Sequence, residues 1–204
     1  RPTLEAYELA LARHGHAHTI PPHMINYRAN IWALKHVGVR QIIAVAAVGG
    51  IRADMSPGRL AVPDQIIDYT YGRGHSFFEG GSAHVTHVDF TWPYDALLRG
   101  TIVKVCRDAG LEAVEDGTYG ATQGPRLETA AEIQRLERDG CTMVGMTGMP
   151  EAALARELEL RYAACAVVAN WAACKTQDVI AMDLIERPLK TGMDKVRVWL
   201  EQVI

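Results

Sequence analysis

The stretch Gln41-Ile42-Ile43-Ala44-Val45-Ala46-Ala47-Val48-Gly49-Gly50 decides the fold of this 204-residue chain. Its first part, residues 41–47, is a continuous apolar run, which is typical of a strand buried on both faces of a sheet. The two glycines end the run. A strand of this kind needs helices on both sides, and the surrounding sequence supplies them.

Strand-like and helix-like stretches alternate along the chain. The sequence predicts strands at 7–12, 41–47, 60–69, 118–122, 141–144 and 162–169, and helices at 24–36, 96–109, 129–138, 150–158 and 183–203. Residues 70–90 form a long Gly- and His-rich loop, of a kind that is usually functional or disordered. The alternation predicts an α/β fold, with one domain over residues 1–204 and a mixed β-sheet flanked by helices on both faces.

The composition favours a small-molecule ligand. Formal net charge is −3, so there is no basic excess and we expect no nucleic-acid partner. No run of about 18 apolar residues is present, so we expect no membrane span. No signal peptide is visible, and the opening at Arg1 suggests a truncated or partly observed product.

Four cysteines are present, and none forms a Cys-x-x-Cys pair. Their neighbours are mostly apolar, as in Ala163-Ala164-Cys165-Ala166-Val167. This favours buried, reduced thiols over disulfides or zinc ligands, and a cytoplasmic protein.

Polar clusters follow the predicted strands. They are Arg13-His14, Gly49-Gly50, residues 123–128, Met146-Thr147 and Asn170. Ligands of α/β folds bind at the carboxyl ends of strands. We therefore expect these clusters to converge on one pocket.

Three of the clusters suit an anion such as phosphate. Arg13 and His14 place a guanidinium beside an imidazole, although a solvated polar turn fits the same residues. Small residues at Gly49-Gly50 let backbone N–H groups approach a ligand, or form only a turn. Thr147 is either a hydroxyl donor beside a helix N-terminus or a simple N-cap.

The remaining clusters also leave two interpretations open. Glu128 either accepts from a ligand donor or, with Thr129, caps the next helix. Met146 and Met149 either pack against a sugar or thioether or belong to the core. Asn170 ends the last strand, where an asparagine is most often a turn or cap residue.

Five segments, in order, resemble the trimeric purine nucleoside phosphorylase and methylthioadenosine phosphorylase family. They are residues 13–18 (Arg-His-Gly-His-Ala-His), 22–30 (Pro-His-Met-Ile-Asn-Tyr-Arg-Ala-Asn), 47–50, 123–132 and 144–152. The Asn-Tyr-Arg-Ala-Asn block and the Gly-Met-Thr-x-x-Pro-Glu block are specific, and the match spans nearly the whole chain. The strand and Gly-Gly-Thr-Gly-like phosphate loop with which the family begins are absent from this chain.

The resemblance implies a pentosyltransferase in which inorganic phosphate is a co-substrate and neither a metal nor a cofactor is needed. Phosphate would be held by Arg13, His14, Ala47 and Thr147. The nucleoside would be bound by Val48, Gly49, Leu127, Met146, Asn170 and Ala172. Asn170, Arg13 and His14 would be catalytic. His87 would reach the 5'-substituent site of a neighbouring subunit in a homotrimer.

Asn170 bears on which purine is released. Methylthioadenosine phosphorylases resemble one another in placing aspartates after this strand, whereas this chain has Asn170-Trp171-Ala172-Ala173. An amide carries both a donor and an acceptor, so Asn170 can donate to a 6-oxo group. We expect cleavage of S-methyl-5'-thioinosine to hypoxanthine and 5-methylthioribose 1-phosphate, in purine salvage.

Four other functions are alternatives. Two are enzymes of the same kind, cleaving either S-methyl-5'-thioadenosine or inosine and guanosine. The third is a non-catalytic nucleoside-binding module, which the missing phosphate loop motivates. The fourth is a hydrolytic nucleosidase, against which Arg13, His14 and Thr147 argue because hydrolysis needs no phosphate site.

Overall fold

A seven-stranded mixed sheet forms the centre of the structure, a computed structural model that describes residues 9–79, 84–176 and 182–203. Its strands are β1 (Gln41–Gly50), β2 (Leu60–Ala61), β3 (Gln65–Asp68), β4 (Ala113–Val114), β5 (Thr118–Ala121), β6 (Cys141–Gly145) and β7 (Arg161–Trp171). The order is β3-β5-β6-β1-β7-β2-β4. Neighbours are parallel except for β1 with β6 and β2 with β7.

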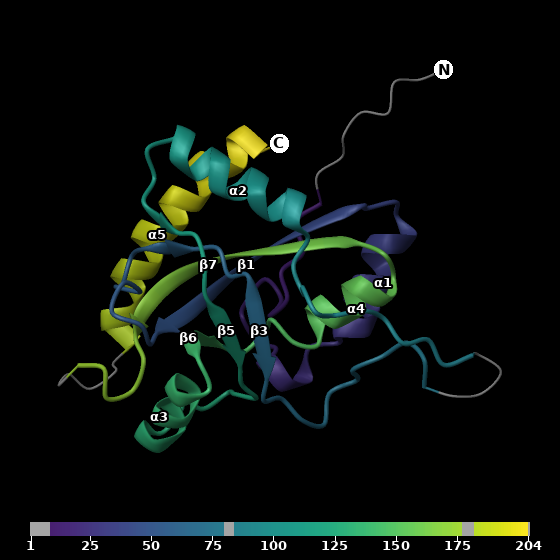
Figure 1. The fold of residues 1–204 in the computed structure, drawn as a ribbon, viewed down its shortest axis with the longest axis horizontal. Coiled ribbons are helices and arrows are strands. Elements are labelled where there is room, and N and C mark those ends of the chain that lie inside the picture. Colours follow the sequence, from purple (N-terminus) through teal and green to yellow (C-terminus); the bar gives the residue numbers. More distant parts are fainter. Residues whose placement is uncertain (1–8, 80–83, 177–181, 204) are drawn as a thin grey trace.

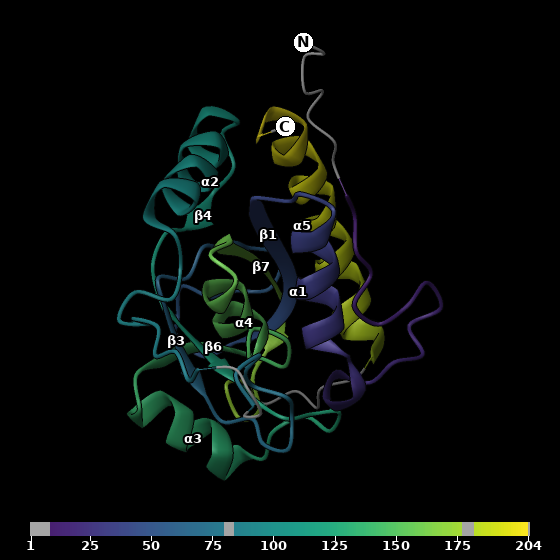
Figure 2. The ribbon, with the colours of Figure 1, turned by 90° about the vertical axis from the view of Figure 1, so that its right-hand side faces the viewer.

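Helices cover both faces of this sheet, which confirms the predicted α/β class. The helices are α1 (Tyr27–His36), α2 (Ala96–Asp108), α3 (Ala130–Arg138), α4 (Glu151–Glu157) and α5 (Met182–Val203), with a 3₁₀ turn at Pro22–Met24. Helices α2 and α5 lie on one side and α1 and α4 on the other, while α3 packs beside β6 (Figure 1). In the quarter-turned view α2 lies at the top of the molecule and α3 at the bottom (Figure 2).

Strand β7 is the strand that is buried on both faces. Tyr162, Ala164, Ala166 and Val168 point into the core that α1 and α4 cover. The alternate residues, Ala163, Cys165 and Val167, point into the core beneath α2 and α5. Successive side chains of a strand face opposite sides, so an unbroken apolar run satisfies both layers.

Strand β1 does not meet the prediction of full burial over residues 41–47. Of these seven residues only Ala44 is buried, and Gln41 and Ala47 are exposed. The reason is pairing: β1 lies against β7 along its whole length but against β6 only at Gly49 and Gly50. No other described strand covers that second edge of residues 41–48.

Two predicted elements near the start of the described chain differ from the structure. The strand predicted at 7–12 is wrong over residues 9–12, which are irregular and leave Leu9 and Leu11 exposed; residues 7–8 lie outside the described residues. No described strand pairs with this run, so its apolar pattern has no ladder to join. The helix predicted at 24–36 begins at Tyr27, because Asn26 caps it by accepting from the Ala29 N–H at 3.0 Å.

Two further differences lie later in the chain. The stretch predicted as one β-rich segment at 60–69 divides into β2 and β3 around Pro63, which has no N–H to give to a ladder. Strand β4 was not predicted, since two residues carry too little pattern to recognise.

Three of the four cysteines are buried free thiols, as predicted: Cys106, Cys141 and Cys165. Burial raises the pKa of each, so they are neutral thiols at neutral pH. Cys174 is exposed, which corrects the prediction for that residue. It lies in the turn after β7, beyond the strand's buried run.

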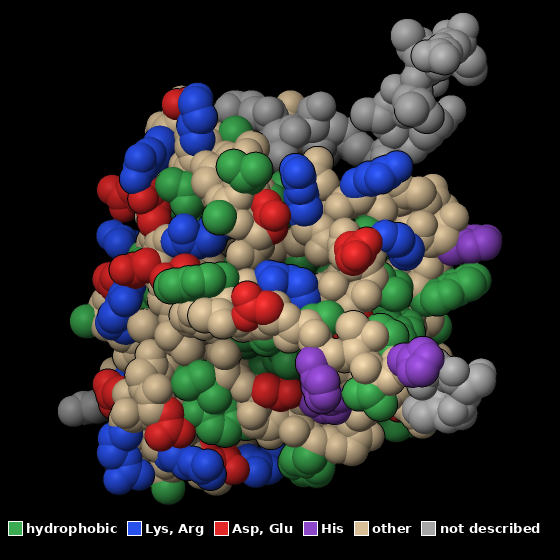
Figure 3. Space-filling view, turned by 45° about the vertical axis from the view of Figure 1, so that its right-hand side comes forward, with side chains coloured by type: hydrophobic (Ala, Val, Ile, Leu, Met, Phe, Trp, Pro, Cys, Tyr) green, Lys and Arg blue, Asp and Glu red, His purple; other side chains and the backbone are tan. Residues whose placement is uncertain are grey.

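The described surface mixes charges of both signs. On the face shown in Figure 3, Lys and Arg side chains are interspersed with Asp and Glu side chains. None of the described helices has both the length and the apolar character that crossing a membrane requires.

Candidate active site

The candidate site lies where the two halves of the sheet meet. Gly49 of β1 is flanked by Val144 of β6 and Asn170 of β7 as strand partners, and a register shift separates Val48 from Gly49. A Cβ on Gly49 would lie 3.5 Å from the Ala172 Cβ. Gly49, Asn170 and Ala172 are therefore neighbours. Gly49 lies near the carboxyl end of β1 and Asn170 near that of β7, and α/β sheets bind ligands outside the carboxyl ends of their strands.

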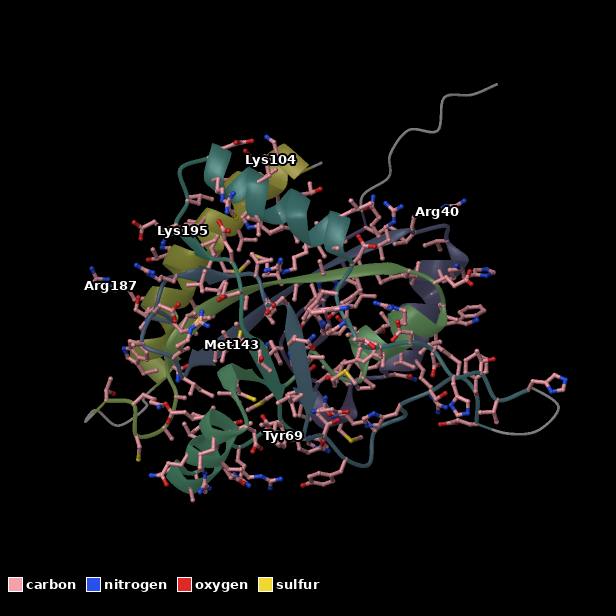
Figure 4. The ribbon with its side chains drawn as sticks, viewed as in Figure 1. Arg40, Tyr69, Lys104, Met143, Arg187 and Lys195 are labelled. Atoms are coloured by element: carbon pink, nitrogen blue, oxygen red, sulfur yellow. The ribbon has the colours of Figure 1, made fainter. Side chains whose placement is uncertain are left out.

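The segment after β6 joins this junction. A Cβ on Gly145 would lie 3.1 Å from a Val48 methyl and 2.1 Å from the hydroxyl of Tyr119. The Thr147 N–H donates to that same Tyr119 hydroxyl at 3.4 Å, and Thr147 is buried. The strands carrying the junction are seen in Figure 4, where Met143 of β6 lies within the sheet and Tyr69, directly after β3, lies near α3.

Thr147 is not a helix cap. The N-cap of α4 is Pro150, three residues later. The alternative interpretation of Thr147 as a simple N-cap is therefore wrong, and its side chain is free of that role. By contrast, Thr129 does cap α3, in a reciprocal capping box with Glu132. Glu128 accepts a hydrogen bond from the Thr122 hydroxyl at 2.6 Å.

Arg13 ties the N-terminal loop to β1 and α4. Its Nη1 donates to the Val45 carbonyl at 3.0 Å. Its Nε and Nη2 donate to the two carboxylate oxygens of Glu151, each at 2.6 Å. Glu151 is the first residue of α4 and also accepts from the Tyr162 hydroxyl at 2.9 Å. Arg13 thus lies close to the segment that carries Thr147.

The Arg13–Glu151 pair is buried and charge-balanced. The side chains are 15% and 5% exposed. Burial by itself lowers the pKa of Arg13, and the charge and hydrogen bonds of Glu151 outweigh it, so the pKa stands above its ordinary value. A bidentate pair of this kind fixes the plane of the guanidinium.

His14 is oriented by its own loop. Its Nδ1 lies 2.7 Å from the Ile20 carbonyl, and its ring stacks on His18 with centroids 4.5 Å apart. Because a carbonyl only accepts, Nδ1 carries the proton.

The other residues predicted for the site differ in their burial and in their contacts with the junction. Ala47 is exposed on β1 and Met146 is half-buried, with its sulfur 2.4 Å from where a Cβ on Gly124 would lie. The Val48 side chain belongs to the core beneath α1 and α4, which leaves its backbone to face a ligand; that Val48 lines the purine stays a prediction. Leu127 and His87 are exposed, and the His87 side chain makes no hydrogen bond to another described residue.

A hollow of about 570 Å³ lies elsewhere, along the outer face of α1. Its lining is Asn26, Arg28, Ala29, Trp32, Ala33 and Phe77. None of the residues predicted to bind phosphate or nucleoside lines it. Contacts at the sheet junction bring part of the set together, and the expectation that all the polar clusters share one pocket stays a prediction.

Sequence reasoning missed three buried groups at the junction: Arg73, Tyr119 and Glu151. Arg73 donates to the carbonyls of both loops that flank the junction. Its position between Gly72 and Gly74 in a long loop gives no sequence signal for this role. Glu151 stood in a recognised block, yet nothing in the spacing linked it to Arg13, 138 residues away.

Gly145 should tolerate no side chain. Gly145→Ala would push the Tyr119 ring away from Thr147, and overpacking of this kind costs about 1–3 kcal/mol. The free energy of unfolding from urea titration at constant m measures it. Gly100→Ala is the control, because a Cβ there meets nothing within 4 Å and Ala favours the helix by about 0.5–1 kcal/mol. Equal unfolding midpoints for the two variants would contradict the packing argument.

Comparisons with known proteins identify the family. The sequence profile of the Phosphorylase superfamily matches residues 1–196. A Pseudomonas syringae pv. tomato protein named "Probable S-methyl-5'-thioinosine phosphorylase" is 56% identical over 194 residues, covering 95% of this chain and 79% of the relative. The "6-oxopurine nucleoside phosphorylase" of Pyrococcus furiosus is 47% identical over 199 residues, covering 95% and 75%.

A solved structure shares the fold. The methylthioadenosine phosphorylase from Schistosoma mansoni in complex with adenine superposes with a TM-score of 0.90 at 29% identity, over 94% of this chain and 73% of that one. The chain therefore spans between 73% and 79% of the length of these three proteins. With a family profile covering residues 1–196 and relatives this similar, the chain belongs to the Phosphorylase superfamily.

Proposed function

We propose that the protein is a nucleoside phosphorylase that cleaves S-methyl-5'-thioinosine with phosphate, giving hypoxanthine and 5-methylthioribose 1-phosphate for purine salvage. One observation carries this: an amide, Asn170, stands beside Gly49 and Ala172 at the junction. The names of the relatives, for methylthioinosine and for 6-oxopurine nucleosides, support the same substrate class.

In the proposed reaction a phosphate oxygen forms a bond to the anomeric carbon as the bond from that carbon to the purine nitrogen breaks. The electron pair leaves with the base, which then takes a proton. Arg13, His14 and Thr147, with the backbone of Ala47, would hold phosphate beneath the sugar, and Met146 would lie against the ribose. Positioning of this kind supplies several kcal/mol of barrier reduction. The substitution requires neither a metal nor a cofactor.

Asn170 would steady the departing base. Its Nδ2 donates to the Trp171 carbonyl at 2.7 Å, which identifies the nitrogen end of the amide because a carbonyl only accepts. The second hydrogen on Nδ2 remains to donate to a 6-oxo group, or to the adjacent ring nitrogen as negative charge builds there. Donors aimed at developing charge stabilise the transition state.

The proposal includes a cytoplasmic homotrimer. The exposed His87 would then reach the 5'-substituent of a substrate in the neighbouring subunit, with Leu127 over the purine. Three buried free thiols support a reducing compartment. Light scattering of the purified protein would test the assembly, and a monomer at assay concentration would reject it.

The experiment that tests the function is product analysis with and without phosphate. We expect hypoxanthine release from methylthioinosine to require phosphate and to yield the sugar 1-phosphate, with kcat/KM at least about tenfold above that for methylthioadenosine. Release of free methylthioribose would identify a hydrolase instead. Calorimetric nucleoside binding without turnover would identify a binding module.

A further inference from the structure

Arg73 is a buried cation held almost entirely by neutral acceptors. It is 9% exposed. Its Nη1 donates to the Met146 carbonyl at 2.8 Å and the Met149 carbonyl at 2.6 Å. Its Nη2 donates to the carbonyls of Thr122 at 3.2 Å and Gln123 at 2.9 Å. These four carbonyls come from two separate loops.

Two further contacts complete the arrangement. The Nε of Arg73 donates to the side-chain oxygen of Gln123 at 3.1 Å, an oxygen that also accepts from the Tyr71 N–H at 3.2 Å. Nη1 also lies 3.1 Å from the hydroxyl of Tyr27, the first residue of α1. The five N–H groups of the guanidinium are thus all engaged, and three parts of the chain meet on one planar group.

The arrangement lacks a dedicated counter-ion among the described residues. Asp68 is the acid whose charge bears on Arg73, but it receives hydrogen bonds from Thr70 and pairs with His75. Burial therefore lowers the pKa of Arg73, since no adjacent carboxylate makes up for the lost hydration of the guanidinium. Burying a cation among dipoles alone is costly, whereas Arg13 in the same region has Glu151. The free-energy cost of burying this charge arises at the place where Arg73 joins the two loops.

The loops that Arg73 joins are those that carry the candidate site. Residues 122–124 follow β5, and residues 146–149 connect β6 to α4. The second loop includes Met146 and Thr147, and the first packs on it, since a Cβ at Gly124 would meet the Met146 sulfur. Misplacing a reacting group by about 1 Å can cost about 100-fold in rate.

We propose that Arg73 is a positioning residue, whose guanidinium fixes the spacing between residues 122–124 and 146–149 and so places Met146 and Thr147 for the reaction. Its kinetic consequence rests on the proposed function; its structural consequence does not. Only a planar group with donors on three nitrogens can serve both loops at once, so lysine should not replace it.

The test compares Arg73→Lys with Arg99→Lys. Arg99 is the matched control, because it donates to the carbonyls of Pro63 and Val62 away from the junction. We expect Arg73→Lys to lower kcat/KM for methylthioinosine about 100-fold, with kcat and KM both affected, and Arg99→Lys to stay within about threefold. Hydrogen exchange should rise at residues 123–124 and 146–149 alone.

The outcomes separate this inference from the proposed function. If the native protein performs no phosphorolysis, the proposed function fails, and the exchange measurement still decides the role of Arg73. Unchanged kcat/KM and exchange in Arg73→Lys would overturn the inference, as would exchange raised equally in α1 to α5, which would mean general destabilisation. If Arg73→Lys does not fold, Gln123→Met serves instead, because it removes one acceptor and leaves the guanidinium in place. Raised hydrogen exchange confined to the two loops in that variant would support the inference. Unchanged exchange would overturn it.

Discussion

Glu151→Gln should cost the protein about 3–5 kcal/mol of unfolding free energy, because it leaves the buried Arg13 charge without its carboxylate. Glutamine keeps the volume of the side chain, so the loss would report charge rather than packing. It would also offer one acceptor where two oxygens now receive Nε and Nη2. Urea unfolding midpoints at constant m measure the change.

An exposed ion pair supplies the control. Glu115 also forms a two-pronged pair with an arginine, Arg107, but on the surface, where water screens the charges and such pairs contribute little to stability. Glu115→Gln should therefore leave the unfolding midpoint nearly unchanged. Similar losses in the two variants would show that the Arg13–Glu151 pair does not behave as a buried one.

A double variant separates stability from function at the same pair. Replacing both partners, as Arg13→Met with Glu151→Met, removes two buried charges together and should recover most of the stability lost in Glu151→Gln. If Arg13 binds phosphate as proposed, the double variant should lose at least about 100-fold in kcat/KM for phosphate. A stable double variant with native phosphate kinetics would exclude Arg13 from the phosphate site.

Asn170→Asp should reverse the choice of purine. The carboxylate cannot donate to a 6-oxo group, and losing that hydrogen bond should cost about 1–3 kcal/mol, which is about 5- to 150-fold in kcat/KM for methylthioinosine. The same carboxylate can accept from the 6-amino group of methylthioadenosine, so that substrate should gain. It would also replace the donor that now bonds the Trp171 carbonyl, so we expect a small loss of stability.

The measurement is the ratio of kcat/KM values for the two nucleosides, in the native protein and in the variant. Asn30→Asp is the control for the change of charge, since Asn30 lies in α1 and not at the junction. A native preference for methylthioadenosine would show that the amide does not select the base. A ratio unchanged by Asn170→Asp would show that Asn170 does not face it.

The sequence by itself determined the fold class, the family and most element positions. Apolar runs, helical periods and caps act over a few residues, so they are legible locally; the Thr129–Glu132 capping box starts α3 for this reason. The apolar run at 162–169 likewise predicted the strand β7. The polar clusters that follow predicted strands identified segments that meet at the junction, including Gly49, Thr147 and Asn170.

Only the tertiary structure decided what those residues touch. The burial of β1 depends on which strands pair with it, and the partner of Arg13 lies on a helix 138 residues away. Which layer of helices covers the Val48 side chain depends on how α1 and α4 pack on the sheet. The contacts of Arg73 could not be predicted from the sequence, because its acceptors are mostly backbone carbonyls. Every residue carries a carbonyl, so no residue type marks the place where four of them converge on one guanidinium.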